Sequence, residues 1–164
     1  MTQRNTAFGV DHSRVVDAAV VRGLEVEIRP RPNVGSLKEA AAALGISPAD
    51  IVKTLVVKRT DDTYLFALVP GDRKISWPKL RAVVGVNKLK MPDADAAMAA
   101  TGYERGTIVP IGSTTPWPVF ADVSITGRRV AMGAGTHGFE LFVDSDALIA
   151  AYDATVADIS EPEG

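Results

Sequence analysis

The chain has 164 residues, 46% of them hydrophobic and 23% charged, and its formal net charge is −2. This length predicts one domain, and the composition is that of a soluble globular protein rather than a disordered chain. The sequence has no cysteine and two histidines, which excludes disulfides, thiol catalysis and cysteine zinc clusters and makes a histidine metal site improbable.

The N-terminal residues are not expected to form a signal peptide, and no transmembrane segment is expected. Residues 1–10 are polar and lack the apolar core of a signal peptide, and no apolar run reaches the length of a membrane span. We therefore expect a cytoplasmic protein without a membrane partner. Its expected parts are a flexible N-terminus over 1–10, one domain over 11–153 and an acidic tail over 154–164.

Short helices and strands are expected along the chain from hydrophobic periodicity and from capping and turn residues. A capping box at Ser36 and Glu39 and a final glycine, Gly45, mark the clearest helix. The expected helices span residues 11–22, 37–44, 76–84, 93–101 and 145–152, and the expected strands span 24–28, 51–58, 64–69, 107–111, 119–123, 128–132 and 139–143. Because these elements show no regular βαβ alternation, they predict an α+β fold with a mixed or largely antiparallel sheet.

Lys53 is a candidate functional residue because its charge falls within an apolar strand. Side chains alternate along a strand, so Lys53 shares one face with Leu55 and Val57. Burial disfavours an ammonium group unless an anion lies nearby, and a phosphate or a developing oxyanion would supply that anion. The alternative is a lysine that protects a sheet edge, and the residues taken alone favour it.

Two glycine-rich segments are further candidates. Residues 102–112 contain three glycines and Pro110, and glycine lets a backbone approach a ligand closely while exposed amides can bind an anion. Two turns around a short strand would explain the same pattern, and composition favours them. In residues 133–138, His137 could act as an acid or a base, although a lone loop histidine is more often a surface residue.

Charge is distributed unevenly. Residues 53–90 hold nine Lys or Arg and three acids, whereas residues 140–164 hold seven acids and no Lys or Arg. This asymmetry can place a basic face on an acidic protein, with nucleic acid as its partner. An ordinary solvated surface is the alternative.

Five motifs in the same order resemble the YbaK/ProX family, the editing domains associated with prolyl-tRNA synthetase. The order of the motifs, rather than any one of them, makes the resemblance specific. The motifs are the helix over 36–44, Lys53-Thr54-Leu55, Gly71-Asp72 with Lys79-Leu80, the 102–112 loop, and a closing strand and helix with Gly135, Gly138, Glu140 and Leu148.

The resemblance implies one α+β domain, a mixed and mostly antiparallel curved sheet flanked by helices, and no metal or other cofactor. It implies a trans-acting aminoacyl-tRNA deacylase that acts on the 3′ CCA end of mischarged tRNA. The expected tRNA is tRNA(Pro) carrying Cys, Ala or a similarly small amino acid, and prolyl-tRNA synthetase is a candidate partner.

The resemblance also implies roles for particular residues. Lys53 and Gly106 are the catalytic candidates. The candidates for substrate binding are Thr54, Ile108, Pro110, Gly112, Gly135, Gly138 and Glu140. The candidates for contact with tRNA phosphates are Lys58, Arg59, Arg73, Lys74, Lys79 and Arg81.

The chain departs from the family pattern at two of these places. The loop reads Gly106-Thr107-Ile108-Val109-Pro110 where the family usually has Gly-Gly-Ile/Val-Ser-Pro, so a backbone role is retained and a serine hydroxyl role is lost. Glu140 stands where Asp is common. These departures motivate an alternative hypothesis, a non-catalytic module that binds tRNA or a synthetase. A third hypothesis is a protein that binds or hydrolyses small free esters in the same cleft.

Overall fold

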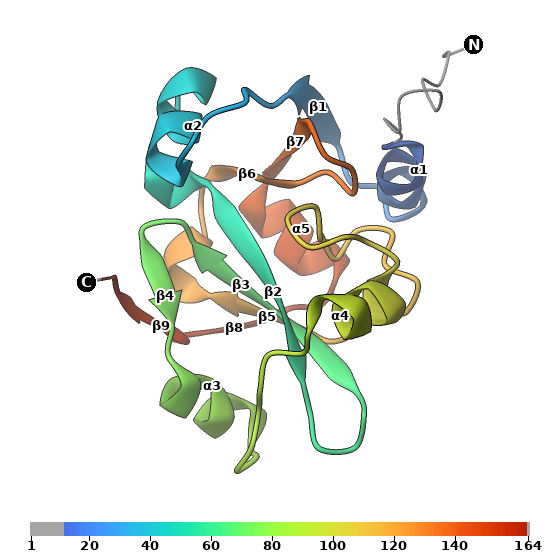
Figure 1. The fold of residues 1–164 in the computed structure, drawn as a ribbon, viewed down its shortest axis with the longest axis vertical. Coiled ribbons are helices and arrows are strands. Elements are labelled where there is room, and N and C mark those ends of the chain that lie inside the picture. Colours follow the sequence, from blue (N-terminus) through green and yellow to red (C-terminus); the bar gives the residue numbers. More distant parts are fainter. Residues whose placement is uncertain (1–11, 164) are drawn as a thin grey trace.

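The computed structural model describes residues 12–163, and short helices surround three small sheets within them (Figure 1). The α-helices of this part of the chain are α1 (Ser13–Val21), α2 (Leu37–Leu44), α3 (Trp77–Val84), α4 (Ala94–Thr101) and α5 (Ser145–Ala151). Four of them begin at a side chain that accepts a hydrogen bond from the amide three residues on: Ser36, Ser76, Asp93 and Asp144. These caps satisfy amides that have no partner inside the helix.

The strands are β1 (Val26–Pro30), β2 (Val52–Lys58), β3 (Tyr64–Pro70), β4 (Arg73–Ile75), β5 (Val119–Asp122), β6 (Arg129–Gly133), β7 (Phe139–Asp144), β8 (Thr155–Ala157) and β9 (Ser160–Pro162). They form the sheets β1-β7-β6, β2-β3-β5-β8 and β4-β9. The β3–β5 and β5–β8 pairs are parallel and the other four pairs are antiparallel. A parallel bridge between Ile51 and Ala131 links the first two sheets. The fold is therefore α+β with mixed, mostly antiparallel strands, as expected.

Both faces of β2 and β3 are covered. Val52 and Val56 pack into the main core with Phe66 and Leu68. On the other face, Val57, Leu65, Val69, Leu80 of α3 and Ile159 form a second core, and Leu55 packs against it. Lys53 has the parity of Leu55 and Val57, so its side chain leaves β2 toward the second core and the C-terminal segment.

Several expected elements differ in the structure. The strand expected over 107–111 is wrong, because these residues form a loop bounded by Gly106 and Gly112, both with left-handed φ angles. The strands β4, β8 and β9 were not expected; each has three residues, too few to show a period. Residues 154–163 of the expected acidic tail contain β8 and β9. The N-terminus over 1–10 lies outside the described residues, and within 12–163 no helix is long and apolar enough to cross a membrane.

Candidate functional site

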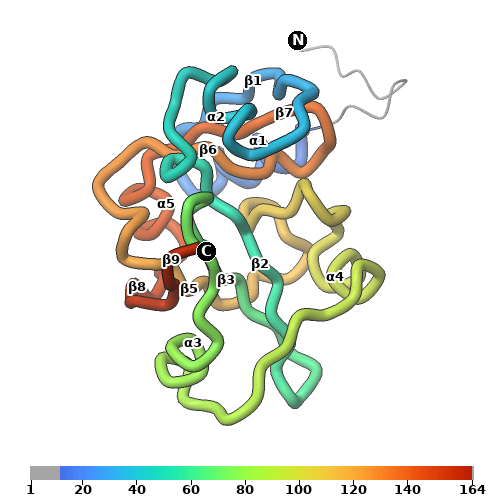
Figure 2. Tube along the Cα trace, turned by 60° about the vertical axis from the view of Figure 1, so that its left-hand side comes forward, coloured from blue at the N-terminus to red at the C-terminus, as the bar shows by residue number. Residues whose placement is uncertain are grey.

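Lys53 lies near the start of β2. The C-terminal end of the chain, marked beside β9 in Figure 2, reaches the Lys53 amine through Glu163. This amine donates a hydrogen bond of 2.6 Å to the carbonyl oxygen of Arg73 and lies 3.7 Å from a carboxylate oxygen of Glu163, with 30% of the lysine side chain exposed. The Lys53 side chain is thus partly buried, and its amine is held by protein atoms. A carbonyl and an exposed carboxylate already supply the negative partners that the sequence predicted for it.

Glu140 of β7 is a buried carboxyl group with one unused oxygen. Its Oε1 lies 3.3 Å from Nε of Arg31, and 4% of its side chain is exposed. Within residues 12–163, Oε2 is buried and has no hydrogen-bond partner, a property shared with the Thr54 hydroxyl and His12 Nδ1. Burial raises the pKa of Glu140 to about 7, against the opposing effect of the Arg31 guanidinium. An unpaired buried polar atom costs stability and is often explained by a function.

The 106–112 loop rests on β6 next to Glu140. Gly133 is the residue of β6 paired with Glu140. A Cβ atom added to Gly133 would lie 2.6 Å from the carbonyl oxygen of Ile108 and 2.7 Å from that of Thr107. The amide of Gly135 donates to the same Thr107 carbonyl at 2.9 Å. A glycine at 133 is therefore required for the loop to pack this closely.

A buried tyrosine and an exposed arginine hold the far end of the loop. The Tyr103 hydroxyl donates to the Ile111 carbonyl at 2.8 Å, and burial raises the pKa of Tyr103 to about 12, so the phenol remains a donor. Arg14 of α1 stacks 4.6 Å from the centre of the Tyr103 ring and donates to the Gly112 carbonyl at 2.6 Å. The loop is thus fixed to α1 and β6 rather than paired as a strand.

The near end of the loop is more open. Gly106 is exposed and adopts a φ angle of +92°. The His137 ring lies beside it, and His137 Nε2 is 3.1 Å from a carboxylate oxygen of Glu104. The amide of Thr107 is bound to the Glu104 carbonyl. An exposed glycine next to a residue whose amide is already hydrogen-bonded can present its own backbone to a ligand.

A family model described as an aminoacyl-tRNA editing domain matches residues 31–151, most of the chain. The chain belongs to the aminoacyl-tRNA editing domain family. The YbaK/ProX resemblance read from the motifs is confirmed.

Similar proteins include synthetases and a free-standing protein. Proline–tRNA ligase of Nitratidesulfovibrio vulgaris (strain DP4) is 33% identical over 138 residues, which are 81% of this editing domain and 24% of the ligase. The chain thus spans about a quarter of that ligase. The Enterococcus faecalis (strain ATCC 700802 / V583) protein provisionally named Cys-tRNA(Pro)/Cys-tRNA(Cys) deacylase EbsC is 26% identical over 164 residues, 99% of this chain and 100% of that protein.

Two crystal structures share the fold of this editing domain. One, provisionally described as a trans-editing enzyme for prolyl-tRNA synthetase, has a TM-score of 0.83 and 29% identity, over 93% of this chain and 97% of that one. The other, described as hypothetical protein APE2540, has a TM-score of 0.82 and 27% identity, over 90% and 99%.

In this editing domain, the candidate substrate-binding residues fall on β2 (Thr54), on β7 (Glu140), in the 106–112 loop and in the turn between β6 and β7 (Gly135 and Gly138). Gly135 binds the loop, and the Gly138 carbonyl accepts a hydrogen bond from the amide of Arg31, the partner of Glu140. Lys53 and Gly133 each lie two residues beyond the Ile51–Ala131 bridge, which brings the start of β2 beside β6. Within residues 12–163, no hydrogen bond or ion pair joins the Lys53 amine to the 106–112 loop. Pro110 is buried and lies away from solvent.

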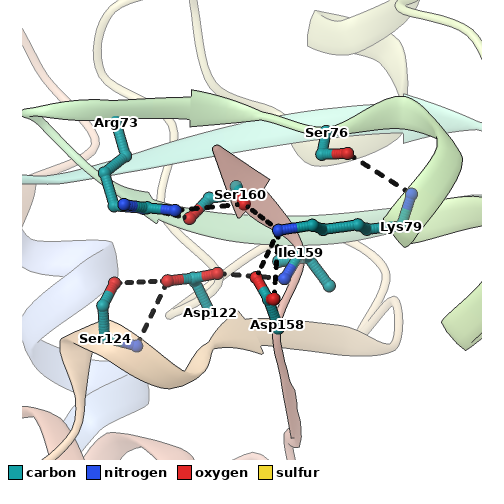
Figure 3. Close-up of polar contacts among 8 residues, drawn as sticks. All are labelled: Arg73, Ser76, Lys79, Asp122, Ser124, Asp158, Ile159 and Ser160. Carbon is teal, nitrogen blue, oxygen red and sulfur yellow. Dashed lines mark hydrogen bonds and ion pairs between the residues drawn. The ribbon is translucent and has the colours of Figure 1, made fainter. Parts of the chain in front are cut away.

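The six basic candidates separate into two whose side chains bind the C-terminal segment, three that line a cavity, and Lys74. Arg73 donates to the Ser160 hydroxyl at 2.7 Å, and Lys79 lies 3.0 Å from Asp158, so both are engaged by the C-terminal segment (Figure 3). Lys74 is exposed on β4. The remaining three, Lys58, Arg59 and Arg81, line a cavity at the other end of β2.

Four residues that shape the site were given no role of their own by the sequence. Gly133 and Tyr103, which lie inside the two candidate segments, and Arg14 and Arg31, which lie outside them, hold the loop and the Glu140 carboxyl group. A glycine inside a strand pattern often marks a close backbone approach, which is the signal that could have identified Gly133. Arg14 has no such local signal, because its partners lie far along the chain.

Proposed function

We propose that this chain is a trans-acting deacylase that hydrolyses the ester of a mischarged tRNA, with tRNA(Pro) carrying Cys, Ala or a similarly small amino acid as its substrate. Family membership and the names of the relatives support this function. The structural observation that carries it is the 106–112 loop packed on Gly133 beside the buried carboxyl group of Glu140.

Hydrolysis of an aminoacyl ester requires little chemical activation. The oxygen of a water molecule attacks the ester carbonyl carbon, an oxyanion forms, and the bond to the ribose oxygen breaks as that oxygen takes a proton. Positioning and oxyanion stabilisation supply most of the acceleration. Because the Thr107 amide is already bound to Glu104, the amides of Gly106 and Ile108 are the proposed oxyanion donors.

Glu140 and Thr54 are proposed to bind the aminoacyl group. The free Oε2 of Glu140 can accept a hydrogen bond from the α-ammonium of the amino acid. The ammonium would be the donor that this oxygen lacks within residues 12–163. The ammonium would stabilise the charged carboxylate and lower its pKa. The unpaired hydroxyl of Thr54 can contact a small polar side chain.

Lys53 is proposed to orient the 3′ end of the tRNA. A phosphate or ribose oxygen of the terminal nucleotide would replace the exposed carboxylate of Glu163, which lies 3.7 Å from the amine. The carbonyl of Arg73 keeps the amine in place through this exchange. The lysine then contributes a fixed positive charge near the ester.

The test is single-turnover deacylation of tRNA(Pro) charged with Cys or Ala, and of tRNAs charged with Ser or Thr. The wild type is expected to release the amino acid, and Lys53→Ala is expected to abolish release while remaining folded at the assay temperature. Lys38→Ala, an exposed position on α2, is the matched control. Tight tRNA binding without release in the wild type would instead identify a binding module, and an unchanged rate in Lys53→Ala would remove Lys53 from the mechanism.

A further inference from the structure

A basic pocket lies at the end of β2 farthest from Lys53, between the β2–β3 hairpin and the segment that follows α3 (Figure 1). Its volume is about 480 Å³. We call this cavity the basic pocket. Its charged lining is Lys58, Arg59, Arg81, Lys88 and Lys90, with Asp62 as the one acid.

The backbone holds two of these lysines directly opposite each other. Lys58 and Lys90 form an antiparallel bridge, with amide-to-carbonyl hydrogen bonds of 2.8 Å and 3.2 Å in the two directions. Directly opposed residues of an antiparallel pair present their side chains on one face, and like charges there are destabilising. Asp62 lies 3.2 Å from Lys58, but 87% of its side chain is exposed, so it offsets only part of this repulsion.

The segment after α3 directs its other lysine outward as well. Leu89 packs into the second core, and the neighbouring Lys88 and Lys90 are exposed. The half-buried leucine therefore fixes two cations at the mouth of the basic pocket. Fixed cations with few acids nearby are typical of a site for a polyanion.

The distance from Lys53 suggests which polyanion. Lys58 is five residues along β2 from Lys53, roughly 17 Å along the backbone at ~3.3 Å per residue, and its side chain leaves the opposite face of the strand. Because β2 is the outer strand of its four-stranded sheet, an RNA that runs from Lys53 to Lys58 passes around this outer strand. At ~3.4 Å per nucleotide, this distance spans about five stacked nucleotides. An RNA whose terminal ester lies at Lys53 would therefore bring the nucleotides beyond its CCA end to the pocket.

We propose that the basic pocket binds the phosphodiester backbone of the tRNA acceptor stem. The choice of RNA as ligand rests on the proposed function. Lysine and arginine contacts to phosphate carry no sequence information and position the duplex. The editing domain would then recognise the ester at one end of β2 and the stem at the other.

The experiment compares two substrates, alanyl-tRNA(Pro) and an alanylated CCA trinucleotide that is too short to reach the pocket. Lys88→Ala/Lys90→Ala is expected to lower kcat/KM on the tRNA about tenfold, mainly through KM, and to leave the trinucleotide rate unchanged. The slope of log affinity against log salt is expected to fall by about one for each lysine removed.

Lys90→Ala and Lys38→Ala form a matched pair, since each removes one exposed lysine and Lys38 lies on α2 at the other end of the molecule (Figure 1). Lys38→Ala is expected to bind tRNA like the wild type. The proposal would be overturned if Lys38→Ala weakened tRNA binding as much as Lys90→Ala does. It would also be overturned if Lys88→Ala/Lys90→Ala lost as much kcat/KM on the trinucleotide as on the tRNA, or lost none on the tRNA. Thermal unfolding of each variant excludes misfolding as the cause of a loss.

Titration with uncharged tRNA distinguishes a failure of the basic-pocket proposal from a failure of the proposed deacylase function. If the wild type binds tRNA but hydrolyses neither substrate, a weaker affinity of the Lys88→Ala/Lys90→Ala variant supports the basic pocket while the proposed function fails. Equal affinities of wild type and variant overturn the pocket whatever the wild type hydrolyses.

Discussion

Glu140 places a proton-binding group in the interior of the fold, where burial disfavours its charged form. Its side chain is 4% exposed, and burial raises its pKa to about 7. Between pH ~4.5 and ~7 the folded state therefore holds a proton that the unfolded chain releases. Stability consequently falls as pH rises through this window, because charging the buried carboxyl is unfavourable.

Glu140→Gln is expected to stabilise the fold at pH 8, by at most about 3 kcal/mol, because a neutral amide of the same shape replaces a buried charge. At pH 4, where the wild-type carboxyl is already protonated, the two proteins should unfold at similar temperatures. Thermal unfolding at both pH values measures this difference. If Oε2 binds the α-ammonium of the substrate, Glu140→Gln should also deacylate far more slowly than the wild type. A Glu140→Gln protein as active as the wild type would contradict the role in substrate binding, and one no more stable at pH 8 would contradict the cost of the buried charge.

Single residues could be selected from the sequence only where the local pattern was unusual. Lys53 was visible as a charge in an apolar strand. Its partners were not, because the Arg73 carbonyl and Glu163 reach it through β4 and the C-terminal segment. The missing partner of Glu140 is a tertiary property too, since it depends on what surrounds Oε2 in three dimensions.

At the scale of elements, the 106–112 loop and β6 act as one unit. The loop carbonyls of Thr107 and Ile108 lie against Gly133, and the Gly135 amide binds the first of them. Gly133 has an ordinary φ angle, so alanine would suit its backbone. The position therefore tests the loop contact without adding backbone strain.

Gly133→Ala is expected to push the loop away from Glu140, because the new Cβ would lie 2.6 Å from a backbone oxygen. Overpacking of this kind costs about 1–3 kcal/mol. Deacylation should fall by more than the stability loss explains, measured on protein shown to be folded at the assay temperature. Gly35→Ala is the control, since its Cβ would meet only Glu39 at 3.7 Å, and equal activity of the two variants would show that the loop position does not matter.

Helices were predictable because their caps are local, whereas the irregular segments were not. Ser36, Ser76 and Asp93 cap helices within three residues of themselves. In contrast, β-branched residues over 107–111 suggested a strand, but Tyr103 and Arg14 fix that segment as a loop. The β4–β9 pair joins segments far apart in sequence, so neither of its short strands carries a signal of its own.

On the scale of the whole molecule, the acidic C-terminal segment lies against the basic middle of the chain (Figure 3). Asp122 of β5 accepts a hydrogen bond from the Ile159 amide at 3.0 Å. Burial works to raise the pKa of Asp122, but hydrogen bonds from Ser124, Ile159 and Ser160 outweigh it and lower the pKa. The Lys79–Asp158 ion pair shows that the uneven charge seen in the sequence serves partly to hold the fold together, whereas five other cations of the middle of the chain line the basic pocket.

Glu163 is the point at which this C-terminal segment meets the candidate site. Its carboxylate lies 3.7 Å from the Lys53 amine, and 59% of its side chain is exposed. An exposed ion pair of this kind is worth at most about 1 kcal/mol. If a substrate phosphate displaces the carboxylate, removing the pair can strengthen binding by no more than about fivefold.

Glu163→Gln is therefore expected to lower the KM for mischarged tRNA by up to about fivefold and to leave kcat unchanged, because the Lys53 amine meets the same substrate in both proteins. The gain should shrink as salt rises, since salt screens exposed pairs. Glu161→Gln removes one charge from the same segment opposite Lys74 and controls for a general loss of repulsion. A KM that rises in Glu163→Gln would mean that the carboxylate positions the lysine rather than competing for it.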